Sequence, residues 1–302
     1  MSSPTPTPIG VVAHYNLLEQ LEPAGPGDLY RARDTRLGRT VAVRLLPDDY
    51  TADRGSLLTT ARQESQLSHP NVTAVFDAGE HEGRVYVAFE FHKGQSLRAE
   101  AAGRPMNVRR AVGIAVEIAD AVATAHAHGC ALRGLSPDAV VISAKGKAKI
   151  SAFALAAQCG FEHNGADARL SDYESPEEAR GETADPRSDV YSVGAILYET
   201  LTTRRPLHRG ASAPSGSNRG VPKQLDPIVL KALAPRPDAR FQSAAELAGE
   251  LRTLLAVLEA PDAAGEEGER SEAVSVGLGR IIAIAGGMLL VVAGVAWWVL
   301  GL

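Results

Sequence analysis

The hydrophobic pattern of this chain changes its period between residues 92 and 97. Before that point short apolar runs predominate, and residues 85–91 have the β-branched and aromatic content of a strand. After it, apolar residues recur at helical spacing. Between residues 108 and 128 they form a stripe broad enough for a largely buried helix, at Val112, Ile114, Ala115, Ile118, Ala119, Val122 and Ala125. We therefore expect short strands over residues 15–92 and helices over residues 97–256, an α+β fold of two lobes.

A second pattern concerns residues 281–302, which include no charged side chain. At about 1.5 Å per residue, a helix of this length extends roughly 33 Å, and the hydrocarbon core of a bilayer is about 30 Å thick. Trp297 and Trp298 stand near the far end, where amphipathic rings favour the headgroup level. The pattern predicts one transmembrane helix over residues 280–302. Residues 257–279, rich in Ala, Gly and Glu, are expected to be a solvated juxtamembrane linker.

Composition limits the partners and the compartment. The net charge of −5, without a basic stripe, argues against nucleic acid as a partner. Residues 1–12 have no charged start and no apolar stretch, so they predict a disordered tail rather than a secretory signal. Together with the predicted span, this indicates a tail-anchored, single-pass protein of the cell membrane with its folded domain in the cytoplasm. The two cysteines, Cys130 and Cys159, are expected to be thiols rather than a disulfide or a metal site.

Small residues recur every four positions at the start of the predicted span, at Gly279, Ala283 and Gly287. This spacing places them on one helix face, as in the close-packed seam of a membrane homodimer. Gly and Ala are also simply common in membrane spans. Both readings stay open.

Two segments carry the candidate chemistry. Residues 130–142 read Cys-Ala-Leu-Arg-Gly-Leu-Ser-Pro-Asp-Ala-Val-Val-Ile, and residues 149–154 read Lys-Ile-Ser-Ala-Phe-Ala. Their spacing resembles the catalytic loop and the metal-binding loop of Ser/Thr protein kinases, H-R-D-L-K-P-E-N-I-L-L and K-L-x-D-F-G. Residues 172–181, 187–194 and 235–251 resemble later segments of the same family in the same order. The chain thus resembles the bacterial membrane-anchored Ser/Thr (Hanks-type) kinases, which implies a bilobal kinase-like domain over residues 13–256.

On this resemblance, the groups that catalyse phosphoryl transfer are replaced. Gly134 stands at the catalytic Asp, Ser136 at the loop Lys, and Ala139 and Ala152 at the two metal ligands. Hard cations require oxygen ligands, which an alanine side chain does not offer. The resemblance therefore implies a pseudokinase: no enzyme activity and no bound metal.

The ion pair that positions the phosphates in the family is altered as well. Arg44 aligns with the lysine of the third strand, and Thr60 aligns with the glutamate that pairs with it. Arginine keeps the charge, but its wide planar fork does not replace a compact ammonium in a fitted pocket. Glu64, one helical turn after Thr60, either pairs with Arg44 or faces solvent, and this question stays open.

The resemblance also implies a vestigial nucleotide cleft. The three glycines of the family's phosphate loop fall on Glu22, Ala24 and Gly27, of which only Gly27 is a glycine. Positions aligned with the walls of the cleft are Gly27, Leu29, Ala42, Arg44, Phe89, Glu90 and Val141. These residues either enclose an adenine ring or pack as ordinary core. No cofactor is expected, and ATP is not expected to bind.

Residues with structural roles in the family are kept. They are Arg133, Phe153, Glu177, Asp189 and Arg240. Glu177 and Arg240 align with a buried ion pair between the activation segment and the last helices, and Asp189 aligns with the aspartate that steadies the catalytic-loop backbone. An intact frame without its chemistry predicts a signalling scaffold or allosteric partner for an active kinase or a phosphopeptide-reading module. The alternatives are a nucleotide-binding sensor switch and, last, a kinase of residual or altered chemistry.

Overall fold

The computed structural model describes residues 7–21, 27–47, 54–130, 132, 135–150, 172–206 and 210–259. The chain divides into two compact units, residues 1–255 and residues 256–302. The first unit holds nearly all of the described structure. Of the second, the structure describes only residues 256–259, which form the end of the last helix.

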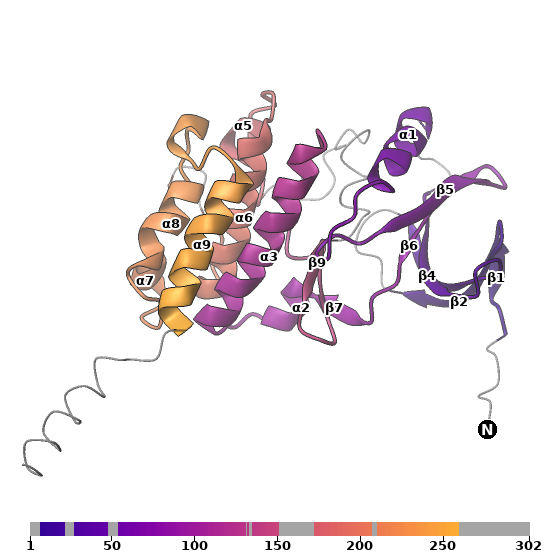
Figure 1. Cartoon of the computed structure of the whole chain (residues 1–302), viewed down its shortest axis with the longest axis horizontal. Helices are drawn as coiled ribbons and strands as arrows, with labels where there is room; N and C mark the ends of the chain where they lie inside the picture. The colour runs from indigo at the N-terminus through magenta and orange to yellow at the C-terminus, as the bar shows by residue number, and fades with distance from the viewer. Residues whose placement is uncertain are drawn as a thin grey trace, which may run out of the picture. The chain divides into compact units, whose positions relative to one another are not determined.

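The N-terminal part of the first unit is an antiparallel sheet of six strands in the order β1-β2-β3-β4-β6-β5. Its strands are β1 (Gly10–Val12), β2 (Tyr15–Leu21), β3 (Asp28–Asp34), β4 (Thr40–Leu45), β5 (Val75–His81) and β6 (Arg84–Glu90). Helix α1 (Arg54–Glu64) lies beside β5 (Figure 1). Its Leu57 packs with Leu46 and Val85 of the sheet. The strand predicted over residues 85–91 is therefore present, shifted by one residue.

The prediction of a disordered tail is wrong for the residues of strand β1. Residues 1–12 were expected to form a disordered tail, yet Gly10–Val12 pair with β2, and the Ile9 amide donates to the Leu17 carbonyl at 2.8 Å. Val12 is buried in the sheet core with Tyr15 and Leu17. Backbone pairing and one buried side chain are enough to hold these residues on the sheet edge, although their sequence has no strand pattern of its own.

A small three-stranded sheet, β7-β8-β9, follows. Its strands are β7 (Gly94–Ser96), β8 (Val140–Ser143) and β9 (Ala148–Ile150). Ile150 forms a parallel bridge with Val72. The side chain of Asn71 donates to the Ala148 carbonyl at 2.8 Å. These contacts fasten the small sheet to the segment that precedes β5.

The rest of the first unit is helical. Its elements are α2 (Leu97–Ala101), α3 (Val108–Ala127), α5 (Pro176–Ala179), α6 (Pro186–Thr202), α7 (Pro214–Ser217), α8 (Leu225–Ala232), the short 3₁₀ helix η1 (Pro237–Ala239) and α9 (Ala244–Glu259). Figure 1 shows α3, α6, α8 and α9 side by side as a bundle. Helix α3 matches the helix predicted over residues 108–128, and the apolar stripe predicted for it is buried.

Helix α6 is the centre of this bundle and is buried over most of its length. Asp185 caps its first turn, and Pro186 at the first helical position fixes the backbone where an amide hydrogen is not needed. A Cβ on Gly194 would lie 2.8 Å from the Cβ of Ala232. Glycine at this position therefore lets α6 and α8 approach closely.

Among the described residues, no helix is both long enough and apolar enough to cross a bilayer. The span predicted over residues 280–302 and most of the linker predicted over 257–279 lie outside the described part of the chain. Helix α9 runs to Glu259, three residues into the predicted linker.

Candidate functional site

Arg44 lies near the end of β4, which pairs with β3 on one side and β6 on the other. Its side chain is only 1% exposed. Burial disfavours the charged guanidinium and lowers the pKa of Arg44 to about 10. Arg44 thus stays protonated at neutral pH and provides a buried positive charge on the sheet.

The residues aligned with an adenine-enclosing wall belong to one packed cluster. Ala42 and Phe89 lie opposite each other on β4 and β6, and both are buried with Val75 and Val87. Leu29, only partly buried, packs against this cluster. The structure thus brings Leu29, Ala42 and Phe89 together in apolar contact. Val141 is partly exposed on β8, in the second sheet.

Gly27 has a structural reason to be a glycine. Its φ is +78°, in the left-handed region, and a Cβ at this position would lie 2.0 Å from the Leu45 carbonyl oxygen. No side chain fits so close to a backbone atom of the neighbouring strand. Its retention is therefore explained by packing at the start of β3, without a bound phosphate. Glu22 and Ala24 lie outside the described residues.

Glu90, at the end of β6, joins the two sheets. Its carboxylate accepts a hydrogen bond from Lys149 of β9 at 2.9 Å and lies 3.3 Å from Nε2 of His92. Burial by itself would raise the pKa of Glu90, but the bond from Lys149 and the charge of His92 outweigh it and lower that pKa. The side chain of Glu90 thus anchors the connection between the lobes.

Helix α1 includes Thr60, which aligns with the glutamate partner of the strand lysine. The side chains of Thr60 and Glu64 are outside the described part of the structure. The pairing of Glu64 with Arg44 therefore stays a prediction. The same holds for the roles of Arg133, Gly134, Ala152 and Phe153, since those residues are not described either.

The described part of the candidate catalytic loop has two polar side chains, Ser136 and Asp138. Leu132 and Leu135 are 1% and 0% exposed, and Ser136 is also buried. Ala139 follows in a turn whose amide donates to the Ser136 carbonyl at 3.0 Å. Among residues 132 and 135–139, Asp138 is the one carboxylate.

Asp138 is held by an arginine of α2. Nε of Arg98 donates to its two carboxylate oxygens at 2.9 and 2.8 Å. The guanidinium also donates to the Tyr173 hydroxyl at 2.9 Å and to Glu199 of α6 at 3.3 Å, and the Tyr173 hydroxyl donates to Glu199. We call Arg98, Asp138, Tyr173 and Glu199 the Arg98 network. Burial and the hydrogen bond to Glu199 raise the pKa of Tyr173. This network was not predicted from the sequence, because its members are far apart in the chain.

Asp189, near the start of α6, holds the backbone of the same loop through a hydrogen bond. Its Oδ2 accepts the Leu132 amide at 2.8 Å and lies 2.7 Å from Nε2 of His126. The side chain is 2% exposed. The backbone contact is the one that the resemblance implies for this aspartate. His126, on α3, was not singled out from the sequence; its only signal was an imidazole next to Ala125, on a helix whose buried residues are all apolar.

Glu177 and Arg240 form a buried, two-pronged ion pair. Nη1 and Nη2 of Arg240 donate to the two oxygens of Glu177 at 2.5 and 2.7 Å. The Ser188 hydroxyl donates to the same carboxylate at 2.8 Å. Burial alone would raise the pKa of Glu177, but the bonds from Arg240 and Ser188 outweigh it and hold that pKa at about 2. The pair fastens α5 to the segment before α9.

The described residues include no group of three or more His, Cys, Asp or Glu side chains arranged to hold a metal ion. Cys130 is partly exposed, and its Sγ lies 3.8 Å from the His128 carbonyl oxygen. Within the described part of the first unit, one hollow lies between α2 and α6, and another lies beside β7 and the turn between β8 and β9. Neither is lined by Ala42, Phe89 or Val141.

The structure has a six-stranded sheet with one helix beside it and a helical bundle that holds a buried loop, and Glu90 joins these two parts. This is the bilobal fold of the protein kinases. Residues 15–255 match the protein kinase domain family, and the chain belongs to that family. Its relatives place it among the bacterial Ser/Thr (Hanks-type) kinases.

Serine/threonine-protein kinase PknB of Mycolicibacterium smegmatis is 36% identical over 271 residues, which cover 81% of this chain and 43% of that protein. Serine/threonine-protein kinase PrkC of Bacillus subtilis is 30% identical over 264 residues, covering 80% of this chain and 41% of that protein. The chain therefore spans about two fifths of the length of these relatives. The crystal structure of the PknI kinase domain of Mycobacterium tuberculosis shares the fold, with a TM-score of 0.67 at 23% identity, covering 81% of this chain and 97% of that one.

Proposed function

We propose that this chain is a protein kinase homologue that transfers no phosphate and acts instead by binding a partner protein at the membrane. The relatives are named serine/threonine-protein kinases, so the frame has a catalytic origin. Phosphoryl transfer needs a base for the substrate hydroxyl and metal ions across the phosphates. The positions aligned with those groups are Gly134, Ala139 and Ala152, none of which has a side-chain oxygen.

The observation that carries the proposal is the position of Asp138. It is the one carboxylate in the described part of the loop, and therefore that part's one candidate to replace the missing base. Both of its oxygens accept hydrogen bonds from Arg98, which also binds Tyr173 and Glu199. A carboxylate engaged in such a network is a structural anchor and is poorly placed to receive a proton from a substrate.

The magnitudes support the same conclusion. Loss of one well-placed electrostatic group commonly lowers a catalytic rate by about 10² to 10³. Here the base, both metal ligands and the strand lysine are all replaced. Such groups act as a unit, so their penalties do not multiply. The loss of one such group, together with the missing metal ligands, already makes the rate of phosphoryl transfer too low to be useful.

Retention of the frame supports a binding role. The ion pair of Glu177 with Arg240 and the contacts of Asp189 keep the helical lobe assembled without serving catalysis. The partner we propose is an active kinase or a phosphopeptide-reading module, and residues 280–302 would tether the complex to the membrane.

The test is incorporation of label from γ-labelled ATP by the purified full chain, with Mg²⁺ and with Mn²⁺. The chain should label neither itself nor a generic acceptor protein above the level of a heat-treated sample. Asp138→Asn and the surface control Glu250→Gln should give the same background. Labelling that is lost in Asp138→Asn but kept in Glu250→Gln would contradict the proposal, because Asp138 would then be serving as the base.

A further inference from the structure

We propose that the hollow between α2 and α6 is a docking site for a peptide segment of a partner protein that carries an aliphatic side chain next to a carboxylate. This inference rests on the proposed function, since it says where and by which chemistry the scaffold binds its partner. We call the hollow the α2–α6 cavity. Its lining residues are Leu97, Arg98, Ala101, Gly103, Arg104, Pro137, Glu199, Thr200 and Thr203.

The size and floor of the α2–α6 cavity suit one aliphatic side chain. Its volume is about 110 Å³, below the roughly 150 Å³ of an engineered cavity that binds benzene. Leu97, Ala101 and Pro137 give it an apolar floor, and Leu97 is fully buried. Gly103, Arg104 and Thr203 are exposed, so the cavity reaches the surface between them. A branched side chain of Val, Leu or Ile size therefore has both space and access.

The polar side chains in the walls already have partners. Arg98 and Glu199 are bound within the Arg98 network. The hydroxyl of Thr200 donates to the Leu197 carbonyl at 2.9 Å, and that of Thr203 donates to the Thr202 carbonyl at 2.6 Å. None of these groups needs a polar ligand, so the interior favours an apolar one.

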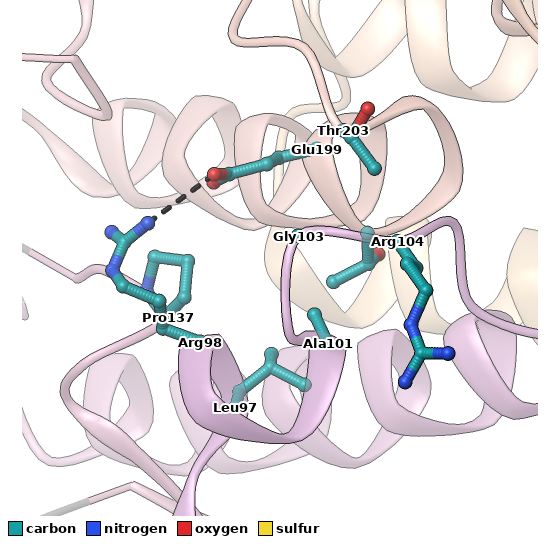
Figure 2. Close-up of a pocket in the computed structure, with 9 residues that line it drawn as sticks. Leu97, Arg98, Ala101, Gly103, Arg104, Pro137, Glu199 and Thr203 are labelled. Carbon is teal, nitrogen blue, oxygen red and sulfur yellow. Dashed lines mark hydrogen bonds and ion pairs between the residues drawn. The ribbon is translucent and has the colours of Figure 1, made fainter.

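Arg104 supplies the charge complementarity. Figure 2 shows Arg98 and Arg104 at opposite ends of the cavity, with the Arg98 guanidinium directed to Glu199. Arg104 is exposed, and within the described residues its side chain makes no ion pair or hydrogen bond. Its backbone is fixed by the turn that ends α2, where Ala102 is left-handed and the Arg104 amide donates to the Ala101 carbonyl at 2.9 Å. A guanidinium at the rim of an apolar hollow is matched by a carboxylate adjacent to the inserted side chain.

A peptide fits these features better than a free small acid. An acid of four or five carbons buries too little apolar surface to offset the loss of its own freedom on binding. A peptide adds flanking backbone and side chains along the exposed loop of residues 102–105. The aliphatic side chain then acts as a buried anchor and the carboxylate as a charged neighbour at the rim.

Because the α2–α6 cavity borders the Arg98 network, docking of a peptide would affect that network. An inserted side chain would contact Arg98 and Pro137, and Arg98 holds Asp138, Tyr173 and Glu199 in one network. Docking would therefore stiffen the contacts among α2, the former catalytic loop and α6.

The test uses the immobilised full chain and a phage-displayed library of random dodecapeptides. We expect enrichment of peptides with Val, Leu or Ile adjacent to Asp or Glu. Arg104→Glu and the cavity-filling Ala101→Phe should each weaken binding of a synthetic enriched peptide at least about tenfold. The matched controls are Arg236→Glu, the same charge change at an exposed arginine, and Ala245→Phe, the same enlargement on the exposed face of α9; both should bind as the parent does.

A charge swap separates docking from damage to the fold. Replacing the peptide's carboxylate by lysine should abolish binding to the parent chain and restore it to Arg104→Glu. Failure to enrich any peptide, enrichment of peptides without this motif, or equal affinity for the parent and both cavity variants would overturn the α2–α6 site. Each of those results leaves the absence of phosphoryl transfer untouched, whereas labelling by γ-labelled ATP would overturn the proposed function and leave a measured docking site in place.

Discussion

Arg240 has a structural role that depends only on contacts within the fold. Its side chain is 0% exposed, and it donates to Glu177 and to the carbonyls of Ala234, Pro235 and Arg187. A buried guanidinium with a complete set of acceptors is tolerated, whereas one that loses its carboxylate is costly. The pair therefore serves as a stability element that does not depend on nucleotide or substrate.

Glu177→Gln tests this pair through its pH dependence. At neutral pH the variant should be less stable than the parent by about 3 to 5 kcal/mol, because it leaves Arg240 buried without its counter-charge. The pKa of Glu177 is about 2 in the folded chain, below the ordinary value of 4.5. The stability it provides is therefore complete above pH 4.5 and is lost as the pH falls toward 2. Urea unfolding at several pH values should show the difference between parent and variant shrinking over this range; a constant difference would contradict the assignment.

Gly27 allows a second test at this scale, with a control inside the same sheet. Gly27→Ala should cost about 3 kcal/mol or more, because left-handed strain of about 1 to 2 kcal/mol is joined by a clash with a backbone carbonyl. Gly83→Ala is the control: its φ is +81°, but no atom lies within 4 Å of the added Cβ. It should show the strain alone. Equal losses in urea unfolding would mean that the approach to Leu45 is not what fixes glycine at position 27.

Among the helices and strands, those with a periodic apolar pattern could be predicted from the sequence. Contacts between residues far apart in the chain could not. The apolar stripe of residues 108–128 predicted α3, because a buried helix repeats its signal every three to four residues. Strand β1 has only three residues, too few for a period, and depends on pairing with β2. The Arg98 network joins residues that are 26 to 101 positions apart, so neither spacing nor composition could identify it. Asp189 was anticipated through the family resemblance, whereas its partner His126 was not.

Asp189 joins three elements, and its removal should affect all of them. Asp189→Ala leaves the buried Leu132 amide without its acceptor and removes the partner of His126, which should cost about 3 kcal/mol. Asp189→Asn keeps an acceptor oxygen and should cost less. Urea unfolding gives the ranking, and hydrogen exchange gives the location, since the Leu132 amide should exchange faster in the alanine variant. Glu250→Ala, an exposed carboxylate on α9, should change neither; unchanged exchange at Leu132 in Asp189→Ala would contradict the contact.

Over the complete chain, the kinase fold and the proposed membrane anchor occupy different residues and have different roles. The frame spans residues 15–255, and its two lobes are joined by contacts such as Glu90 with Lys149. Nothing in that frame explains residues 281–302, which have no charge to solvate and no place in the fold's pattern. A membrane tether raises the effective concentration of a scaffold for partners on the same surface, so the anchor and the binding function support each other.

The anchor is tested by two lysines at the middle of the predicted span, Leu289→Lys with Val292→Lys. Each charge at the bilayer centre should cost about 2.5 to 3.5 kcal/mol, enough to prevent stable insertion. The parent chain should stay with membranes after alkaline carbonate extraction, and the double variant should move to the supernatant. The control is Val257→Lys, at a residue that is 64% exposed on α9, and it should stay with the membranes. If the parent is itself extracted, or if the double variant is retained as firmly, residues 281–302 do not anchor the protein, and the partner must be sought without the restriction to a membrane surface.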